Sequence, residues 1–412
     1  MNMALQPLPF EEVDFTQTSV EETVAQLIRY AANLPASDLF ICFEENDVAV
    51  NVRHLGLVRP VTRMTHEQGR RMINHAKAMS GMDLAQRQRP LDGRWVCDFD
   101  HGQRMDLRVN TIPTMYGEDL CARLLKRNAE LLELENLGLH RKSLVDLKGM
   151  LGSPSGLILV TGPTGVGKTA TLYSCLNYLN NGTRKINTIE DPIEYALAGV
   201  RQSAIRPQID LDFPEMLRSV LRQAPDVIMI GEIRDPVTAE TAVRAANSGH
   251  LVLATLHAPI AAAGVDSMLA LGVHAHFLST GLLGIVTQRL VRTLCPKCRV
   301  EWDISQAPHT FDDVRTWLQP GQGQHIYSAP GCDNCFQEGY VGRTGVFEVL
   351  CVTRELRQAI AQRKPARQIG DKAAEQGMLD MRRAALLKVA DGTTSAEETL
   401  RAIPAEHLLP NY

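Results

Sequence analysis

The stretch "LILVTGPTGVGKTATL", residues 157–172, decides the fold of this chain. Four apolar residues, Leu157 to Val160, predict a buried strand, and "GPTGVGKT" from Gly162 to Thr169 follows closely and fits the pattern G-x-x-x-x-G-K-[ST]. The next segment, "ATLYSCLNYLNN", reads as a helix. A strand, a glycine-rich loop and a helix in this order predict a phosphate-binding loop within a parallel sheet flanked by helices.

This loop contains the residue types that phosphate binding needs. Glycines let consecutive backbone N–H groups point at an anion, and the helix N-terminus adds positive potential. Lys168 would reach the β- and γ-phosphates, and the Thr169 hydroxyl would bind Mg²⁺. A chance glycine-rich loop is the alternative, and the flanking strand and helix argue against it. We therefore predict an ATP and Mg²⁺ site formed by Gly162, Pro163, Thr164, Gly165, Val166, Gly167, Lys168, Thr169 and Ala170.

Further apolar runs behind the loop, "INTI", "VIMI" and "LVLATL", alternate with helical segments, as in a parallel sheet. "VIMIGE" places Glu232 just beyond a buried strand, where an acid can position a water or hold the metal. "INTIEDPIEY" groups Glu190, Asp191 and Glu194, whose mutual repulsion a cation would offset. A solvated turn is the alternative for that acidic group.

Two histidines and two arginines complete the candidates around the loop. "SGHLVLATLH" carries His250 and His257 at the two ends of an apolar run; a lone histidine is more often structural, but this pair lies in the predicted sheet. "LRSVLRQAPD" places Arg218 and Arg222 four residues apart on one helical face. Such arginines would contact a γ-phosphate, including across a subunit boundary, or form a solvated basic face.

Composition restricts the class of protein. The 412 residues are 44% hydrophobic and 22% charged, with a net charge of −4, which argues against broad nucleic-acid binding. The start of the chain lacks the pattern of a signal peptide, and its apolar runs fall short of the roughly 20 residues of a membrane span. Nine scattered cysteines favour a reducing compartment. We expect a cytoplasmic protein that is at most peripheral to a membrane.

The pattern also predicts domain boundaries. We expect a loose tail (1–18), an N-terminal α/β domain (19–135), a linker (136–150) and an ATPase domain (151–412), which contains an insert (290–350) and a helical C-terminal region (351–412).

Two cysteine pairs mark the insert: "CPKC", with Cys295 and Cys298, and "CDNC", with Cys332 and Cys335. Four thiolates in two C-x-x-C pairs match a closed, tetrahedral, structural zinc site. A redox role is the rival, but redox C-x-x-C motifs occur singly beside a thioredoxin-like pattern. Chance spacing is a further alternative. We predict Zn²⁺ bound by all four cysteines.

Taken together, these motifs resemble the secretion-superfamily ATPases, the hexameric motors of type II secretion, type IV pilus assembly and competence pseudopili. The resemblance runs from about Ser19 to Ile403, and its strength is a fixed order of four segments: the phosphate loop, "TIEDPIEY", "DVIMIGEIRD" and "SGHLVLATLH". It implies an α/β fold with a PAS-like N-terminal domain. A RecA-like P-loop NTPase domain would follow, with a zinc-binding insert and a helical C-terminal region.

The resemblance also implies roles for single residues. Glu232 matches the glutamate that polarises the attacking water, with Glu190 as the second candidate for that base. His257 matches a residue that senses the γ-phosphate. The arginines implied to contact the nucleotide are Arg218, Arg222 and, from the N-terminal domain, Arg53.

The expected function is therefore that of a Mg²⁺-dependent ATPase that drives pilus or pseudopilus assembly. The resemblance implies a hexamer, docked on inner-membrane platform and docking proteins at the cytoplasmic face, with no nucleic-acid partner. Among the motors that this chain resembles, a four-cysteine insert is present in assembly and secretion motors and absent from retraction motors. Two departures are "SDLFICF" and "APIAAAG", where further polar residues are usual, and the tail is too short for the usual docking domain.

Two other readings remain open at this point. One is a conjugation-type ATPase for DNA transfer, and the other is an ATP-binding scaffold with little turnover. The sequence also leaves open whether the product is a secretion pseudopilus, a pilus or a competence filament, and which of Glu232 and Glu190 activates the water.

Overall fold

The computed structural model describes residues 19–34, 36–98, 104–125, 133–206, 209–307 and 309–408, so the predicted tail lies outside it. The chain divides into two compact units. The first contains Met1–Arg127 and Cys332–Gly342, and the second contains Asn128–Gly331 and Arg343–Tyr412.

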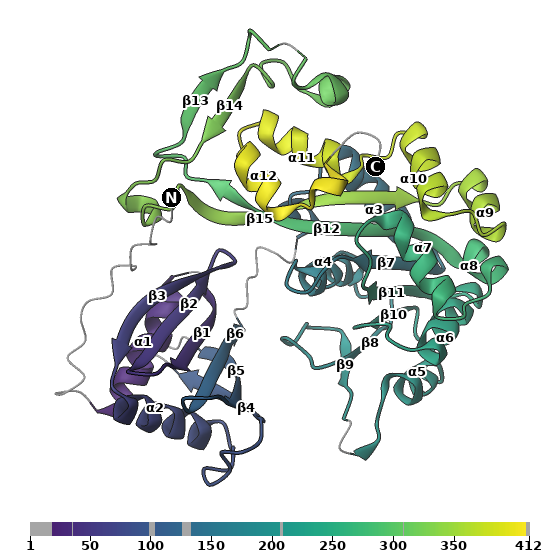
Figure 1. The fold of residues 1–412 in the computed structure, drawn as a ribbon. Helices are drawn as coiled ribbons and strands as arrows, with labels where there is room; N and C mark the ends of the chain where they lie inside the picture. Colours follow the sequence, from purple (N-terminus) through teal and green to yellow (C-terminus); the bar gives the residue numbers. More distant parts are fainter. Residues whose placement is uncertain are drawn as a thin grey trace. The chain divides into compact units, whose positions relative to one another are not determined.

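A six-stranded antiparallel sheet forms the first unit, in the order β3-β2-β1-β6-β5-β4 (Figure 1). Two helices, α1 (Val20–Asn33) and α2 (His66–Met79), pack against it, and the Ser19 hydroxyl caps α1. Alternate residues of β2 and β5 are apolar and enter the core. This alternation is typical of strands, because successive side chains point to opposite faces of a sheet. The strands are β1 (Ala36–Phe43), β2 (Val48–His54), β3 (Leu57–Met64), β4 (Leu91–Asp98), β5 (Arg104–Pro113) and β6 (Glu118–Leu125).

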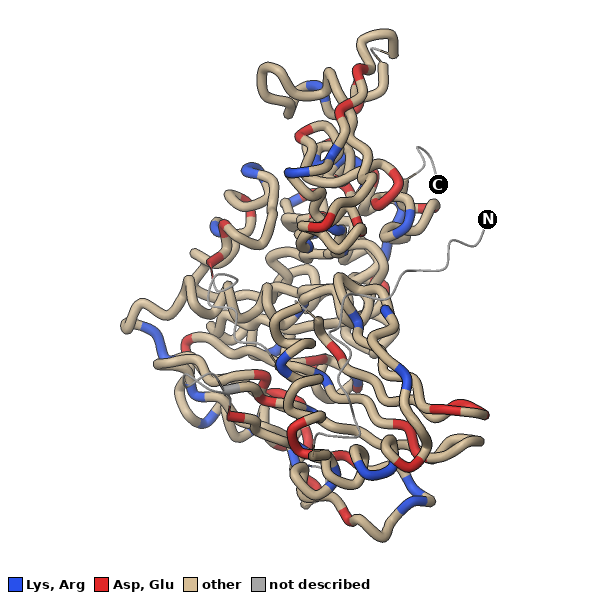
Figure 2. Tube along the Cα trace, turned by 90° about the vertical axis from the view of Figure 1, so that its left-hand side faces the viewer, with Lys and Arg blue, Asp and Glu red and all other residues tan. Residues whose placement is uncertain are grey.

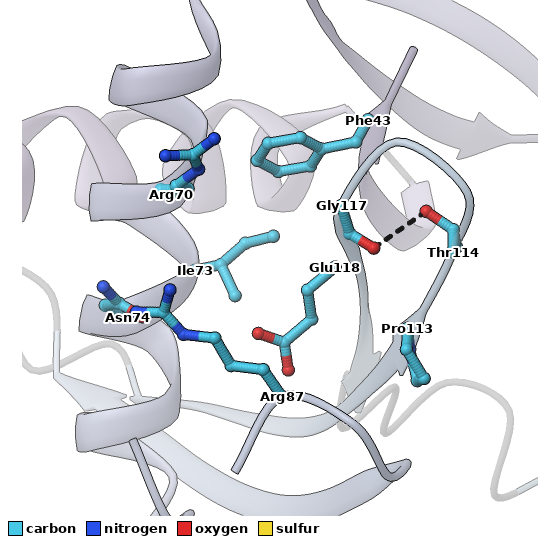
Figure 3. Close-up of a pocket in the computed structure, with 9 residues that line it drawn as sticks. All are labelled: Phe43, Arg70, Ile73, Asn74, Arg87, Pro113, Thr114, Gly117 and Glu118. Atoms are coloured by element: carbon cyan, nitrogen blue, oxygen red, sulfur yellow. Dashed lines mark hydrogen bonds between the residues drawn. The ribbon is translucent and has the colours of Figure 1, made fainter. Parts of the chain in front are cut away.

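A cavity of about 230 Å³ lies in this unit, between α2 and the turn that joins β5 to β6 (Figure 3). Phe43 and Ile73 line it with apolar surface, and Arg70 and Arg87 point toward it from the exposed rim. Beside it the buried ammonium of Lys77 pairs with the Glu118 carboxylate at 2.9 Å. All residues that line the cavity belong to the first unit.

The second unit contains a seven-stranded sheet in the order β15-β12-β7-β11-β10-β8-β9 (Figure 1). The neighbours from β12 to β9 pair in parallel. Strands β7, β10 and β11 are fully buried, near-continuous apolar runs, as expected when both faces of a sheet are covered, whereas the edge strand β9 is polar. The bounds of the seven strands are β7 (Gly156–Thr161), β8 (Ile186–Glu190), β9 (Arg201–Ala204), β10 (Val227–Ile230), β11 (Leu251–Leu256), β12 (Leu282–Leu294) and β15 (Tyr340–Cys351).

Helices cover both faces of this sheet. Leu157 and Leu159 of β7 enter one apolar core, and Ile158 and Val160 enter the other. The first core is closed by α5 (Phe213–Leu221), α6 (Pro236–Asn247), α7 (Ala261–Ala270), α8 (Ala275–Gly281), α9 (Arg354–Ala361) and α10 (Ala366–Glu375). The second is closed by η3 (Leu134–Leu137), α3 (Arg141–Leu151) and α4 (Lys168–Leu179). Most of the predicted linker 136–150 is thus helix α3, with Leu147 in the core.

The remaining elements follow β12. A two-stranded ribbon, β13 (Val300–Asp303) and β14 (His325–Ser328), lies with η5 (Asp312–Trp317) and η6 (Asp333–Cys335) in the predicted insert. The C-terminal region adds α11 (Met381–Ala390), α12 (Ala396–Ala402) and η7 (Ala405–His407). Among the described residues, no helix has the length and apolar character that crossing a membrane requires.

Candidate nucleotide site and cysteine cluster

The candidate residues gather at the carboxyl ends of the parallel strands. The phosphate loop follows β7, Glu190 ends β8, Glu232 comes two residues after β10, and His257 comes directly after β11. The register aligns these ends, since Leu256 pairs with Thr161 and Ile230 pairs with Ala254. This edge of an open parallel sheet is where ligands bind in such folds.

The phosphate loop has the backbone that its glycines allow. Gly162, Gly165 and Gly167 have φ of 137°, 80° and 88°, which side chains with a Cβ rarely adopt. A Cβ on Gly162 would lie 2.6 Å from the carbonyl oxygen of Gln288. The Lys168 ammonium donates to the carbonyls of Gly162 at 2.7 Å and Pro163 at 3.1 Å, and burial lowers its pKa. The cation is therefore held at the loop, where a phosphate would arrive.

Gln288 of β12 clamps the loop from the neighbouring strand, and we did not predict this role. Its Nε2 donates to the carbonyl of Val166 at 2.7 Å, and its Oε1 accepts from the Thr171 hydroxyl at 2.7 Å. The side chain is 2% exposed. One amide thus fixes both the loop and the first turn of α4. The signal in the sequence was the segment "QRLVRTLCPKC", which begins with this residue.

Glu232 and His257 are in direct contact. His257 Nε2 lies 2.6 Å from Glu232 Oε1, with 16% of the Glu232 side chain and 54% of the His257 side chain exposed. Arg234, which we did not single out, donates from Nε to Glu232 Oε2 at 2.6 Å and lies 3.6 Å from Asp191. Contact with Glu232 raises the pKa of Arg234. The carboxylate of Glu232 is thus oriented from both sides.

Glu190 has a different environment. It is 3% exposed, and it accepts from the Tyr173 hydroxyl, from the Thr188 hydroxyl at 2.5 Å and from Gln202 Nε2 at 3.1 Å. Burial, with the hydrogen bond to Glu190, raises the pKa of Tyr173. Both carboxylate oxygens of Glu190 therefore already accept hydrogen bonds from protein groups.

The other predicted residues are not brought into this group. His250 lies at the opposite end of β11, where its Nδ1 is 3.0 Å from the carbonyl of Ala245. Arg218 and Arg222 are exposed at the end of α5, and neither forms an ion pair with a described acidic residue. Arg53 belongs to the first unit, where Asp38 holds its guanidinium at 3.3 Å.

The four predicted cysteines converge. The sulfur atoms of Cys295, Cys298, Cys332 and Cys335 all lie within 4.8 Å of one another. Sulfurs about 3.8 Å apart are what four Zn–S bonds of about 2.3 Å require in a tetrahedron. The backbone N–H groups of Cys332 and Gly339 point at Cys335 Sγ at 3.2 and 3.1 Å, as expected around a thiolate. The donor set fits a zinc ion.

Residues 14–401 match the model of the family described as Type II/IV secretion system protein. The chain belongs to this family. Among family members, type II secretion system protein E of Dickeya dadantii is 40% identical over 377 residues, which is 90% of this chain and 73% of that protein. The type IV pilus assembly ATPase PilB of Thermus thermophilus is 38% identical over 394 residues, 96% of this chain and 44% of PilB.

Solved structures of other ATPases have the same fold. The ATPase DotB of Legionella pneumophila superposes with a TM-score of 0.70 over 96% of this chain and 98% of DotB, at 20% identity. The pilus retraction motor PilT with bound ADP gives a TM-score of 0.60 over 92% of this chain and 96% of PilT, at 26% identity. These matches confirm the predicted fold class, the family and its ATPase class.

Proposed function

We propose that this chain is a Mg²⁺-dependent ATPase motor that drives assembly of a pilus or pseudopilus. The observation that carries the proposal is the meeting of Glu232 and His257 at the strand ends beside the phosphate loop. Lys168 and Thr169 would bind the β- and γ-phosphates and Mg²⁺. Membership in a family that includes type II secretion and type IV pilus proteins supports the proposal that ATP hydrolysis drives filament assembly.

In this proposal Glu232 is the general base. A base must be reachable by water: Glu190 is 3% exposed and accepts hydrogen bonds from Tyr173, Thr188 and Gln202, whereas 16% of the Glu232 side chain is exposed. His257 orients Glu232 and contacts the γ-phosphate. Arg218, Arg222 and Arg53 would stabilise charge on the nucleotide once subunits assemble, since phosphoryl transfer depends on positioning and charge stabilisation.

Zinc would hold the insert closed without taking part in hydrolysis, because four cysteine ligands leave no open position on the metal. The four-cysteine insert favours an assembly motor over a retraction motor. We further propose a hexameric ring at the cytoplasmic face of the inner membrane, with a platform protein as its partner. A DNA-transfer role has less support, since Lys and Arg number 43 against 47 Asp and Glu, and the two signs are interspersed along the described chain (Figure 2).

The decisive experiment measures Mg²⁺-dependent phosphate release by the wild type and by Glu232→Gln. Light scattering gives the mass of the protein assembly in the presence of ATP. We expect turnover in the wild type, loss of turnover in the variant and a ring in ATP for both. Turnover that requires DNA would favour the DNA-transfer role. Tight ATP binding without phosphate release, with a membrane platform present, would favour a scaffold.

A further inference from the structure

A buried carboxylate behind the catalytic edge has no role in the site described above. Glu348 lies on β15, is 4% exposed, and is flanked in sequence by the buried residues Phe347 and Val349. No described lysine, arginine or histidine pairs with it. A carboxyl group buried without a cation takes up a proton more readily than one in water, and its oxygens need hydrogen-bond partners. The question is which groups provide them.

Both oxygens of Glu348 accept from the first backbone N–H of a helix. Oε1 accepts from Ala261 N, at the start of α7, at 2.7 Å. Oε2 accepts from Met381 N, at the start of α11, at 3.0 Å. Because the first N–H groups of a helix lack partners within it and carry partial positive charge, a carboxylate from the sheet caps both helices at once.

The contact with α7 matters most, because α7 has no other side-chain cap. Its N-cap residue, Ile260, makes no such hydrogen bond. In α11, by contrast, the N-cap Asp380 accepts from Arg383 N at 2.8 Å. Glu348 is therefore the side chain that fixes where α7 begins.

His257 is tied to this point by a short segment. Only Ala258, Pro259 and Ile260 separate it from Ala261. On its other side, β11 ends at Leu256, which is in register with Thr161 of β7. The backbone of His257 is thus anchored at both ends, by the sheet and by the capped start of α7. A shift of α7 moves the imidazole away from Glu232.

We propose that Glu348 is a positioning residue for ATP hydrolysis, which acts by holding the start of α7 so that His257 stays in contact with Glu232. The proposal rests on the proposed function, because it assigns Glu348 a role in that reaction. The hydrogen bonds of Glu348 seen among the described residues go to Ala261 and Met381, not to Glu232 or the phosphate loop, so its effect passes through the segment 258–260. The bond to Met381 N fixes the second oxygen and hence the orientation of the first.

The test uses the full-length chain and Glu348→Gln, which keeps the volume of the side chain but loses one of two acceptor oxygens. The matched control is Glu398→Gln. Glu398 of α12 is equally buried, and its carboxylate serves Arg292 and Arg401 instead. Three quantities are measured for each: ATP affinity, single-turnover hydrolysis, and amide hydrogen exchange in the peptide 256–263. Glu348→Asp, which keeps the charge and shortens the reach, is the second variant if Glu348→Gln does not fold.

We expect Glu348→Gln to bind ATP as the wild type does, to hydrolyse it about tenfold more slowly, and to exchange the amides of 256–263 faster. A misplacement of about 1 Å is enough for such a loss. Glu398→Gln should leave the hydrolysis rate and this peptide unchanged.

Equal hydrolysis rates in Glu348→Gln and wild type would overturn the proposal. A loss of ATP affinity in Glu348→Gln as large as its loss of hydrolysis rate would also overturn the proposal. So would a loss of hydrolysis rate in Glu398→Gln as large as that in Glu348→Gln. Either result would indicate that Glu348 has a structural role alone. If the wild type does not hydrolyse ATP, the proposed function fails. Hydrogen exchange then still decides whether Glu348 fixes the start of α7, and unchanged exchange in 256–263 overturns that step as well.

Discussion

His257 Nε2 contacts Glu232 Oε1 at 2.6 Å, across the ends of two adjacent parallel strands. This contact orders the candidate site, because it fixes one oxygen of the carboxylate while Arg234 binds the other. A carboxylate held on both sides presents its remaining lone pairs in one direction. That direction is what a base needs in order to hold an attacking water in line with a phosphate.

Replacement of His257 by alanine should lower turnover about 100-fold, while ATP affinity changes by less than about threefold, since an orienting group acts mainly on the reaction step. Steady-state phosphate release and nucleotide titration measure the two quantities. His250→Ala is the matched control, because His250 lies at the other end of the same strand and its imidazole contacts the carbonyl of Ala245. An equal loss in both variants would show that the strand, and not the contact with Glu232, is what matters.

Arg234→Ala should reduce single-turnover hydrolysis by about tenfold, because Glu232 loses one of its two orienting partners and the nearby Asp191 loses its cation. ATP affinity should stay close to that of the wild type. Arg244→Ala removes an exposed arginine of α6 that lies near Glu240, so it serves as the control and should have no effect. Faster hydrolysis in Arg234→Ala would mean that Arg234 restrains Glu232 rather than orients it.

Gln288→Leu should weaken ATP binding about tenfold, or about 1.4 kcal/mol. The change keeps the volume of the side chain but removes two hydrogen bonds, to the loop at Val166 and to Thr171, each of which contributes about 1 kcal/mol. Titration with a fluorescent ATP analogue measures the change. Gln376→Leu, at the exposed end of α10, should bind the analogue like the wild type. Unchanged affinity in Gln288→Leu would contradict the role of Gln288 as a clamp.

Features carried by one short segment could be predicted from the sequence, and contacts between distant segments could not. The phosphate loop and the acids at strand ends could be predicted, because each is carried by a short segment whose period and composition are visible in the chain. The roles of Gln288 and Glu348 could not be predicted. Gln288 lies 122 residues from Val166, whose carbonyl it binds, and Glu348 lies 87 residues from Ala261, whose backbone N–H it binds. The strand order also decides which acid contacts His257: Glu232 follows β10, which is next to β11 in the sheet, whereas Glu190 ends β8. Two of the hydrogen bonds that occupy Glu190 come from Tyr173 and Gln202, which no motif linked to it.

Purified protein should contain one Zn²⁺ per chain, measured by elemental analysis. Cys298→Ser should lose the metal and lower the thermal stability of the insert, since structural zinc contributes directly to folding. Cys351→Ser removes a cysteine outside the cluster and should retain zinc. A metal-free wild type, or retention of zinc in Cys298→Ser, would contradict the site.

The pH dependence of stability gives an independent measurement on Glu348. Burial, together with the charge of the nearby Asp380, raises the pKa of Glu348 from 4.5 to about 7, although the hydrogen bonds from Ala261 N and Met381 N act to lower it. Between these values the folded chain holds a proton that the unfolded chain has released. The contribution of Glu348 to the free energy of unfolding therefore falls as pH rises from 4.5 to 7, by on the order of 3 kcal/mol, and is constant above that range. Glutamine does not titrate, so Glu348→Gln should gain stability relative to the wild type between pH 5 and pH 8. Denaturation midpoints of both proteins at the two pH values, with Glu398→Gln alongside, measure this difference. A difference that does not change with pH would mean that Glu348 stays charged throughout.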